Sequence, residues 1–118
     1  MITFLKAEEQ HQHSNGGGWV ANTAVVAASA YIGPDALVYG DAWVYGNARV
    51  YGNAQVYGDA RVCSDALVYG NARVYGDALV SGDARVSGNA RVYGDALVSG
   101  DAWVSGNAIL VTSKGERQ

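Results

Sequence analysis

The chain has 118 residues, which is enough for one domain with a buried core. Eight Lys and Arg residues against eleven Asp and Glu residues give a net charge of −3, which argues against nucleic acid as a partner. A single cysteine, Cys63, excludes an intramolecular disulfide framework and fits a reducing compartment.

The beginning of the sequence, MITFLKAEEQ, has only a short apolar run and does not have the form of a signal peptide. Nothing in the chain approaches the length of a membrane-spanning apolar stretch. We therefore expect a soluble cytoplasmic protein without a membrane partner. Residues 1–18 precede the regular part of the sequence, and Ile2, Phe4 and Leu5 predict that they form a cap at one end of the domain.

From residue 19 to residue 111 the chain is an array of hexapeptides without an insertion or deletion, and most of them have the pattern V-[YS]-G-[DN]-A-x. An aliphatic residue occurs at every sixth position from Val20 to Leu110, and Ala precedes it by two positions from Ala24 to Ala108. An internal repeat of this regularity predicts a solenoid. Residues 112–118 are a polar C-terminal tail outside the repeat, expected either to fray or to shield the far end.

Each hexapeptide reads as a short strand followed by a turn. The run A-x-V-[YS] alternates with the period of a strand, so that Ala and Val share one face and the variable residue and Tyr or Ser share the other. Gly-Asp and Gly-Asn are turn dipeptides, because these residues tolerate a positive φ. A strand of four residues cannot bury itself, so that successive hexapeptides must stack on one another.

Three hexapeptides make a triangular coil of 18 residues with three Val and three Ala pointing inward. The aliphatic–x–x–x–small–x pattern, as in Val38-Tyr-Gly-Asp-Ala42-Trp, resembles the hexapeptide-repeat family of left-handed parallel β-helices over about residues 18–111. The resemblance implies an all-β, left-handed triangular solenoid of about five coils. The opening NGGGWV, at residues 15–20, is similar to that of uncharacterised bacterial and prophage members rather than to that of the acyltransferases.

Wrapping the sequence at 18 residues sorts the variable residues into columns, in which coils lie about 4.8 Å apart. One column holds four tyrosines beside two arginines, and we interpret it either as a structural stack or as an aromatic surface for a protein partner. Its spacing allows offset ring stacking, and the arginines allow cation–π contacts. This candidate binding surface consists of Tyr39, Tyr57, Tyr75, Tyr93, Arg73 and Arg91.

A second column places large apolar side chains on the outside. A monomer rarely exposes a continuous apolar strip to water, so this face is the predicted oligomer interface. The resemblance to the hexapeptide-repeat family implies a homotrimer first and a dimer second. The interface column consists of Trp43, Arg61, Leu79 and Leu97.

The turn residues form columns of their own. One is an asparagine ladder that begins below Asp35, in which the amides are spaced to hydrogen-bond along the stack. Another is a line of four carboxylates, read mainly as turn caps, with a cation site or an imitation of nucleic-acid phosphates as alternatives. The first column is Asn53, Asn71, Asn89 and Asn107, and the second is Asp41, Asp59, Asp77 and Asp95.

The sequence offers little catalytic chemistry, and we expect no enzyme activity, no cofactor and no metal site. His11 and His13 lie in EEQHQHSNGGG, which we read as a polar, solvated linker that would hold a general base poorly. Cys63 and Ser64 interrupt the repeat, and Cys63 is expected to be an outward thiol without a neighbouring base.

These observations predict a non-enzymatic scaffold or protein-interaction module of bacterial or phage origin. One alternative is a degenerate acyltransferase-like protein that binds a small ligand between subunits, in which case a pocket near His11 or His13 is expected. The other alternative is a phage-encoded inhibitor of a host protein.

Overall fold

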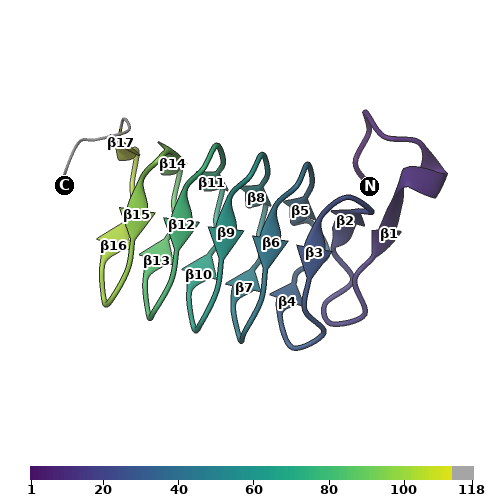
Figure 1. The fold of residues 1–118 in the computed structure, drawn as a ribbon, viewed down its shortest axis with the longest axis horizontal. Coiled ribbons are helices and arrows are strands. Elements are labelled where there is room, and N and C mark those ends of the chain that lie inside the picture. Colours follow the sequence, from purple (N-terminus) through teal and green to yellow (C-terminus); the bar gives the residue numbers. More distant parts are fainter. Residues whose placement is uncertain (113–118) are drawn as a thin grey trace.

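The protein is a parallel β-solenoid whose coils follow one another along the long axis (Figure 1). The computed structural model describes residues 1–112. Three sheets form the sides of the coil, one with seven strands and two with five strands. The predicted all-β solenoid of about five coils is confirmed, and the left-handed winding stays a prediction from the resemblance.

The strands are short, and almost all contain one outward and one inward residue. The seven-stranded sheet contains, in spatial order, β1 (Gln10–Gln12), β2 (Trp19–Ala21), β5 (Leu37–Val38), β8 (Gln55–Val56), β11 (Arg73–Val74), β14 (Arg91–Gly94) and β17 (Ile109–Thr112). The second sheet contains β16 (Trp103–Val104), β13 (Arg85–Val86), β10 (Leu67–Val68), β7 (Arg49–Val50) and β4 (Tyr31–Ile32). The third contains β15 (Leu97–Val98), β12 (Leu79–Val80), β9 (Arg61–Val62), β6 (Trp43–Val44) and β3 (Val25–Val26).

The pairing register between coils is 18 residues. Trp43 of β6 pairs with Arg61 of β9, which pairs in turn with Leu79 of β12. The inward residues of the inner coils are completely buried, as Val74 and Ala72 illustrate with 0% exposure. Because every coil contributes the same Val and Ala residues, the core is a stack of identical layers, and burying one such Val contributes on the order of 1.5–3 kcal/mol.

The corners depend on glycine for two reasons. The corner glycines have φ near +65°, as at Gly58 with +68°, where a side chain is strained. A Cβ atom at Gly58 would also lie 2.9 Å from the backbone nitrogen of Gly76 in the next coil. This close approach lets the backbone N–H of Asp59 donate to the carbonyl of Gly76 at 2.8 Å, so that the corners are hydrogen-bonded from coil to coil.

Residues 1–18 cover the first coil. Strand β1 pairs antiparallel with β2 at the edge of the seven-stranded sheet, after the short 3₁₀ helix η1 (Ala7–Glu9). Ile2 has 0% exposure, and the buried Gln10 side chain accepts from the Ile2 backbone N–H at 2.8 Å and donates to the Ile2 carbonyl at 3.0 Å. The purple segment beside β2 in Figure 1 is therefore a folded cap.

The glycine-rich link between β1 and β2 packs tightly on the first coil. The backbone N–H of Gly18 donates to the carbonyl of Ile32 at 2.9 Å. A Cβ atom at Gly16 would lie only 2.1 Å from the same carbonyl oxygen. The NGGG segment is thus needed for this close backbone approach as well as for the turn itself.

The tail predicted to fray or to shield the far end lies, apart from Thr112, outside the described residues. Across residues 1–112, no helix is long and apolar enough to cross a membrane.

Ser64 is the one residue other than glycine with a positive φ in the described part of the chain, at +60°. It takes the corner position that glycine holds in the neighbouring coils. Because a side chain in this conformation costs about 1–2 kcal/mol, we expect Ser64→Gly to raise the free energy of unfolding by about 1 kcal/mol in urea denaturation.

The reverse change at an equivalent corner is the control. Gly58→Ser should lower the free energy of unfolding by at least as much, because it adds both the strained φ and the contact with Gly76. Equal stability of wild type and Ser64→Gly would contradict this explanation of the corner.

Candidate interaction surfaces

The tyrosine column predicted beside the seven-stranded sheet forms a continuous ladder of stacked rings. Ring centroids are 4.7 Å apart between Tyr39 and Tyr57, and 4.9 Å apart for both Tyr57–Tyr75 and Tyr75–Tyr93. The rings are parallel within 4°. The predicted ring stacking is therefore confirmed, and we call these four residues the tyrosine ladder.

The first ring of the ladder is covered by a residue of the cap. Phe4 meets Tyr39 edge to face, with centroids 5.0 Å apart and an interplanar angle of 75°. Sequence reasoning missed this contact, because Phe4 lies outside the repeat and has no column assigned by the 18-residue period. The contact joins the cap to the outer surface, although Phe4 itself is 66% exposed.

The stacking determines what the ladder can offer to a partner. The inner rings, Tyr57 and Tyr75, have neighbouring rings against both faces, so a sugar could not stack on these faces. Each ladder tyrosine is half-buried. The ladder therefore presents ring edges and hydroxyl groups at the spacing of the coils, a surface suited to a flat protein partner.

The hydroxyl of Tyr39 is also fixed within the fold. It donates to the side-chain oxygen of Gln55 at 3.0 Å. Burial raises the pKa of Tyr39 above its ordinary value of 10.0, the neighbouring Tyr57 raises this pKa further, and Arg73 partly opposes both effects. At neutral pH this end of the ladder is a neutral hydrogen-bonding surface.

The arginines contact aromatic rings at other places than predicted. Arg73 and Arg91 flank the ladder on exposed strand positions, but the cation–π contacts found within residues 1–112 belong to the other two faces. The guanidinium of Arg61 lies 5.3 Å from the ring centroid of Trp43, and that of Arg85 lies 5.0 Å from that of Trp103. In both pairs the guanidinium lies over the indole ring of an adjacent coil, and indole is the most favourable ring for a cation–π contact.

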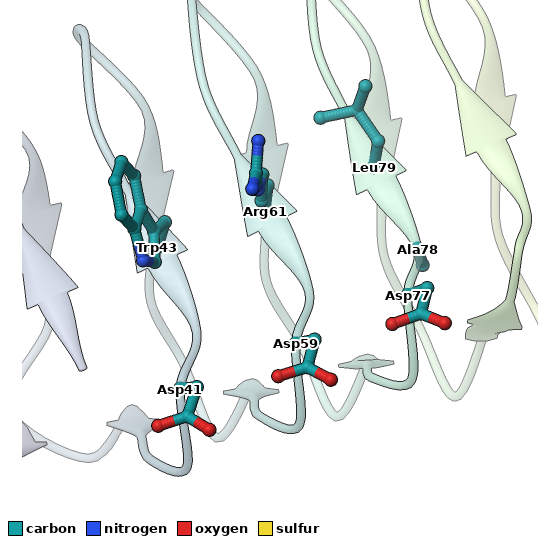
Figure 2. Close-up of a pocket in the computed structure, with 7 residues that line it drawn as sticks. All are labelled: Asp41, Trp43, Asp59, Arg61, Asp77, Ala78 and Leu79. Atoms are coloured by element: carbon teal, nitrogen blue, oxygen red, sulfur yellow. The ribbon is translucent and has the colours of Figure 1, made fainter. Parts of the chain in front are cut away.

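The predicted oligomer interface lies along the third sheet and borders a groove. Trp43 and Leu97 are 44% and 54% exposed. The groove of about 500 Å³ runs between this column and the neighbouring corner, and Figure 2 shows its side chains on three successive coils. Its lining consists of Asp41, Trp43, Asp59, Arg61, Asp77, Ala78 and Leu79.

One side of the groove is acidic. The carboxylates of Asp41, Asp59 and Asp77 follow one another along the corner in Figure 2, and all three side chains are exposed. Exposure to water relieves their mutual repulsion, because the interaction of like charges is weak at high dielectric. Within the described part of the chain, no group of three or more His, Cys, Asp or Glu residues is placed to hold a metal ion.

The predicted asparagine ladder is confirmed at the next corner. Side-chain amides donate to the carbonyl oxygens one coil further at 3.4 Å for Asn53–Asn71 and at 3.2 Å for both Asn71–Asn89 and Asn89–Asn107. Each amide satisfies its neighbour, so the ladder supports the corner and does not present an open site. On the second sheet Tyr51 and Tyr69 form a shorter ring stack, with centroids 5.0 Å apart.

The expected solvated linker around the histidines is wrong. His13 is buried, and its Nε2 lies 2.8 Å from the carbonyl oxygen of Ala30, while Nδ1 of the exposed His11 lies 2.7 Å from the side-chain oxygen of Asn22. The antiparallel pairing of β1 with β2 fixes this segment on the first coil. The groove beside Trp43 is lined by neither histidine.

The Cys63 thiol lies at the predicted outward position of the repeat, but neighbouring side chains bury it. Cys63 occupies the outward tyrosine or serine position but is only 8% exposed. A hydrogen bond with Cys63 raises the pKa of the Tyr45 hydroxyl, and burial adds to this rise. The thiol thus lies beside the Tyr45 hydroxyl of the preceding coil.

A sequence model of the YdcK beta solenoid repeat matches six overlapping segments of the chain, namely residues 42–58, 54–70, 66–82, 72–92, 84–100 and 90–106. Together these segments cover more than half of the sequence. The chain belongs to the YdcK β-solenoid repeat family. No curated protein matches the chain significantly.

Membership of the YdcK family agrees with the solenoid described above and extends over β6 to β16. The matched region contains most of both candidate surfaces. In this chain the residues that recur from coil to coil build the core and the corners. The outward residues vary from coil to coil, so a binding surface must be made by them. The cap residues, including Phe4 and Ile2, lie before the matched segments.

The raised pKa of Tyr39 predicts a dependence of stability on alkaline pH. A group whose pKa is raised by folding stabilises the fold fully below its unfolded pKa, and this contribution is lost as pH rises through the folded pKa. We therefore expect the midpoint of thermal unfolding to fall once pH exceeds the ordinary tyrosine value of 10.0. In the Tyr39→Phe variant this midpoint should fall less steeply over the same pH range. A pH profile equal to that of the wild type would contradict the assignment of the alkaline loss of stability to Tyr39.

Proposed function

We propose that this solenoid is a non-enzymatic scaffold that assembles into a homo-oligomer and presents the tyrosine ladder to a protein partner. The observation that carries the proposal is the apolar column of Trp43, Leu79 and Leu97 along the third sheet, in which Trp43 and Leu97 are exposed and Leu79 is half-buried. A trimer is the preferred assembly, as the resemblance to hexapeptide-repeat proteins implies, and a dimer is the second choice.

The geometry of the third sheet supports an interface. The column lies on a straight row of parallel strands, so that several coils can contact a flat partner at once. Arg61 stands between the apolar residues, close to the acidic side of the groove. In an oligomer, this guanidinium can approach a carboxylate of a neighbouring copy, which fixes the register of the two chains.

The tyrosine ladder supports the partner-binding role. Tyrosine contributes large contact area and hydrogen bonding at small entropic cost, because its side chain has few rotatable bonds. Stacking has already restricted the rings of Tyr57 and Tyr75, so binding requires little further ordering. The flanking Arg73 and Arg91 add charge that favours an acidic partner surface.

The bacterial or phage setting and the cytoplasmic location belong to the same proposal. They rest on the NGGGWV opening, on the single cysteine and on the composition of the chain. A host-directed inhibitor would be one form of such an interaction module. The acyltransferase-like alternative receives no support from the histidines, because His13 is buried in the cap and His11 is bonded to Asn22.

The oligomer interface is tested by Trp43→Glu combined with Leu97→Glu. Both side chains are exposed, and Arg61 already occupies the same column, so the fold should tolerate the charges. We expect the molar mass measured by light scattering to fall by the number of copies that the outer face joins, threefold for a trimer and twofold for a dimer, because the apolar contact is replaced by repelling carboxylates.

The matched control changes the other surface. Tyr57→Ser combined with Tyr75→Ser should keep the mass of the wild-type oligomer and the β-sheet circular dichroism, since serine occupies the equivalent positions Ser81 and Ser87 on the other faces. An unchanged mass in the Trp43 and Leu97 variant, or a fall in the tyrosine variant, would refute the choice of face.

A further inference from the structure

Two arginines of the seven-stranded sheet stand directly opposite each other, and we call them the arginine pair. Arg73 of β11 pairs in register with Arg91 of β14 in the next coil (Figure 1), and both side chains are exposed. Among the strand pairings of residues 1–112, this is the one pair of like charges. The other strand arginines have uncharged neighbours, namely Trp43 and Leu79 for Arg61, Tyr31 and Leu67 for Arg49, and Leu67 and Trp103 for Arg85.

The arginine pair is unfavourable for the fold on its own. Neighbouring strands lie about 4.8 Å apart, and like charges directly opposite each other on them are destabilising. Arg61 and Arg85 each lie over an indole ring, whereas the cation–π contacts found within residues 1–112 do not include the arginine pair. A negative group from outside the chain would relieve the repulsion between the two guanidiniums.

The corner on the near side of the arginine pair is neutral. The residue two positions before each member of the pair is an asparagine of the ladder, whereas the equivalent residue before Arg61 and before Arg85 is an aspartate. The aspartates of the other corner of this sheet, including Asp77 and Asp95, lie beyond the tyrosine ladder. A group that approaches over the asparagine corner therefore meets two positive charges before it meets a carboxylate.

The arginine pair and the tyrosine ladder share one face. Tyr75 and Tyr93 occupy the next outward positions after the two arginines, and their ring centroids are 4.9 Å apart. Burial and the neighbouring Tyr57 raise the pKa of Tyr39, and Arg73 partly lowers it, so the positive charge is felt along the ladder. Guanidinium and hydroxyl groups together make this face rich in hydrogen-bond donors.

We propose that the arginine pair is a carboxylate-binding site, which receives neighbouring Asp or Glu side chains from an acidic segment of the protein partner. This inference rests on the proposed function, because it names the chemistry of the partner that the tyrosine ladder binds. A guanidinium binds a carboxylate through two parallel N–H···O bonds, and a carboxylate beside two guanidiniums offsets their repulsion. The rings of Tyr75 and Tyr93 then border the bound segment.

The small extent of the positive charge selects the kind of partner. Gln55 precedes the arginine pair in its column and Ile109 follows it, so that the charge is confined to two coils. Nucleic acid binds through many phosphate contacts, and the carboxylates beyond the ladder and the net charge of −3 repel a long polyanion. Two carboxylates on one protein segment fit a site of this length.

The repulsion within the pair is tested on the protein alone. Arg73→Gln should raise the midpoint of thermal unfolding in low salt, and this gain should shrink in high salt because ions screen the repulsion. Arg49→Gln is the matched control and should not raise the midpoint, because Arg49 pairs with the uncharged Tyr31 and Leu67. The inference is overturned by an Arg73→Gln midpoint no higher than that of the wild type, or by an equal rise in both variants.

The site is tested with fluorescently labelled hexaglutamate, whose binding to the full-length chain is followed by anisotropy in low salt. Arg73→Gln combined with Arg91→Gln should weaken binding about tenfold or more, because charge-assisted contacts are lost. Arg49→Gln combined with Arg85→Gln removes the same charge from the second sheet and should change the affinity less than about twofold. Equal losses in the two variants, or equally tight binding of labelled hexaglutamine, would overturn the inference.

Failure of this inference can be told apart from failure of the proposed function. The assembly is judged by the molar mass of the Trp43 and Leu97 variant, and the glutamine variants leave that column unchanged. The double variant of the arginine pair should keep the wild-type mass, and a lower mass would overturn the inference because the pair would then hold copies together. If Tyr57→Ser combined with Tyr75→Ser abolishes hexaglutamate binding and the arginine variant does not, the ladder remains the binding surface and the carboxylate site is refuted.

Discussion

The hydrogen bonding of each coil to the next through glycine corners is the interaction on which the rest of this structure depends. A strand of two residues has no stability of its own, and the flat corner allows its backbone to pair along the whole chain. At the corner of Gly58, the positive φ and the 2.9 Å approach to Gly76 that a Cβ atom would make mean that a side chain destabilises the fold. Glycine is therefore the residue that favours stacking most, and Ser64 is the one exception among the described corners with a positive φ.

Identical layers have a further consequence for function. Since Val and Ala fill the core in every coil, the outward residues can vary without disturbing it, and the 18-residue register aligns them in rows. The tyrosine ladder, the asparagine ladder and the apolar column are three results of one period. Their chemistry differs because one side stacks rings, one satisfies amides internally, and one leaves indole and leucine side chains in water.

The sequence predicted the architecture because the repeat has no insertion and its period is fixed by the core. The ring stack of Tyr57 with Tyr75 and the amide ladder at Asn71 followed directly from that period. The contacts of the cap did not, since His13 and Phe4 lie outside the register and are placed by tertiary packing on the first coil. Burial of the Cys63 thiol was missed because the repeat predicts only that this side chain points outward and not which side chains cover it.

The stacking of each coil on the next in an 18-residue register is tested most directly by deleting one complete coil, residues 55–72. This change joins Ala54 to Arg73, keeps every column in register and brings Tyr75 beneath Tyr39. We predict a folded protein with β-sheet circular dichroism and cooperative unfolding in urea. Deletion of residues 55–71 leaves one extra residue that interrupts the register, and it should unfold at a clearly lower urea concentration. An unfolded first variant, or equal urea midpoints for the two deletions, would contradict the account.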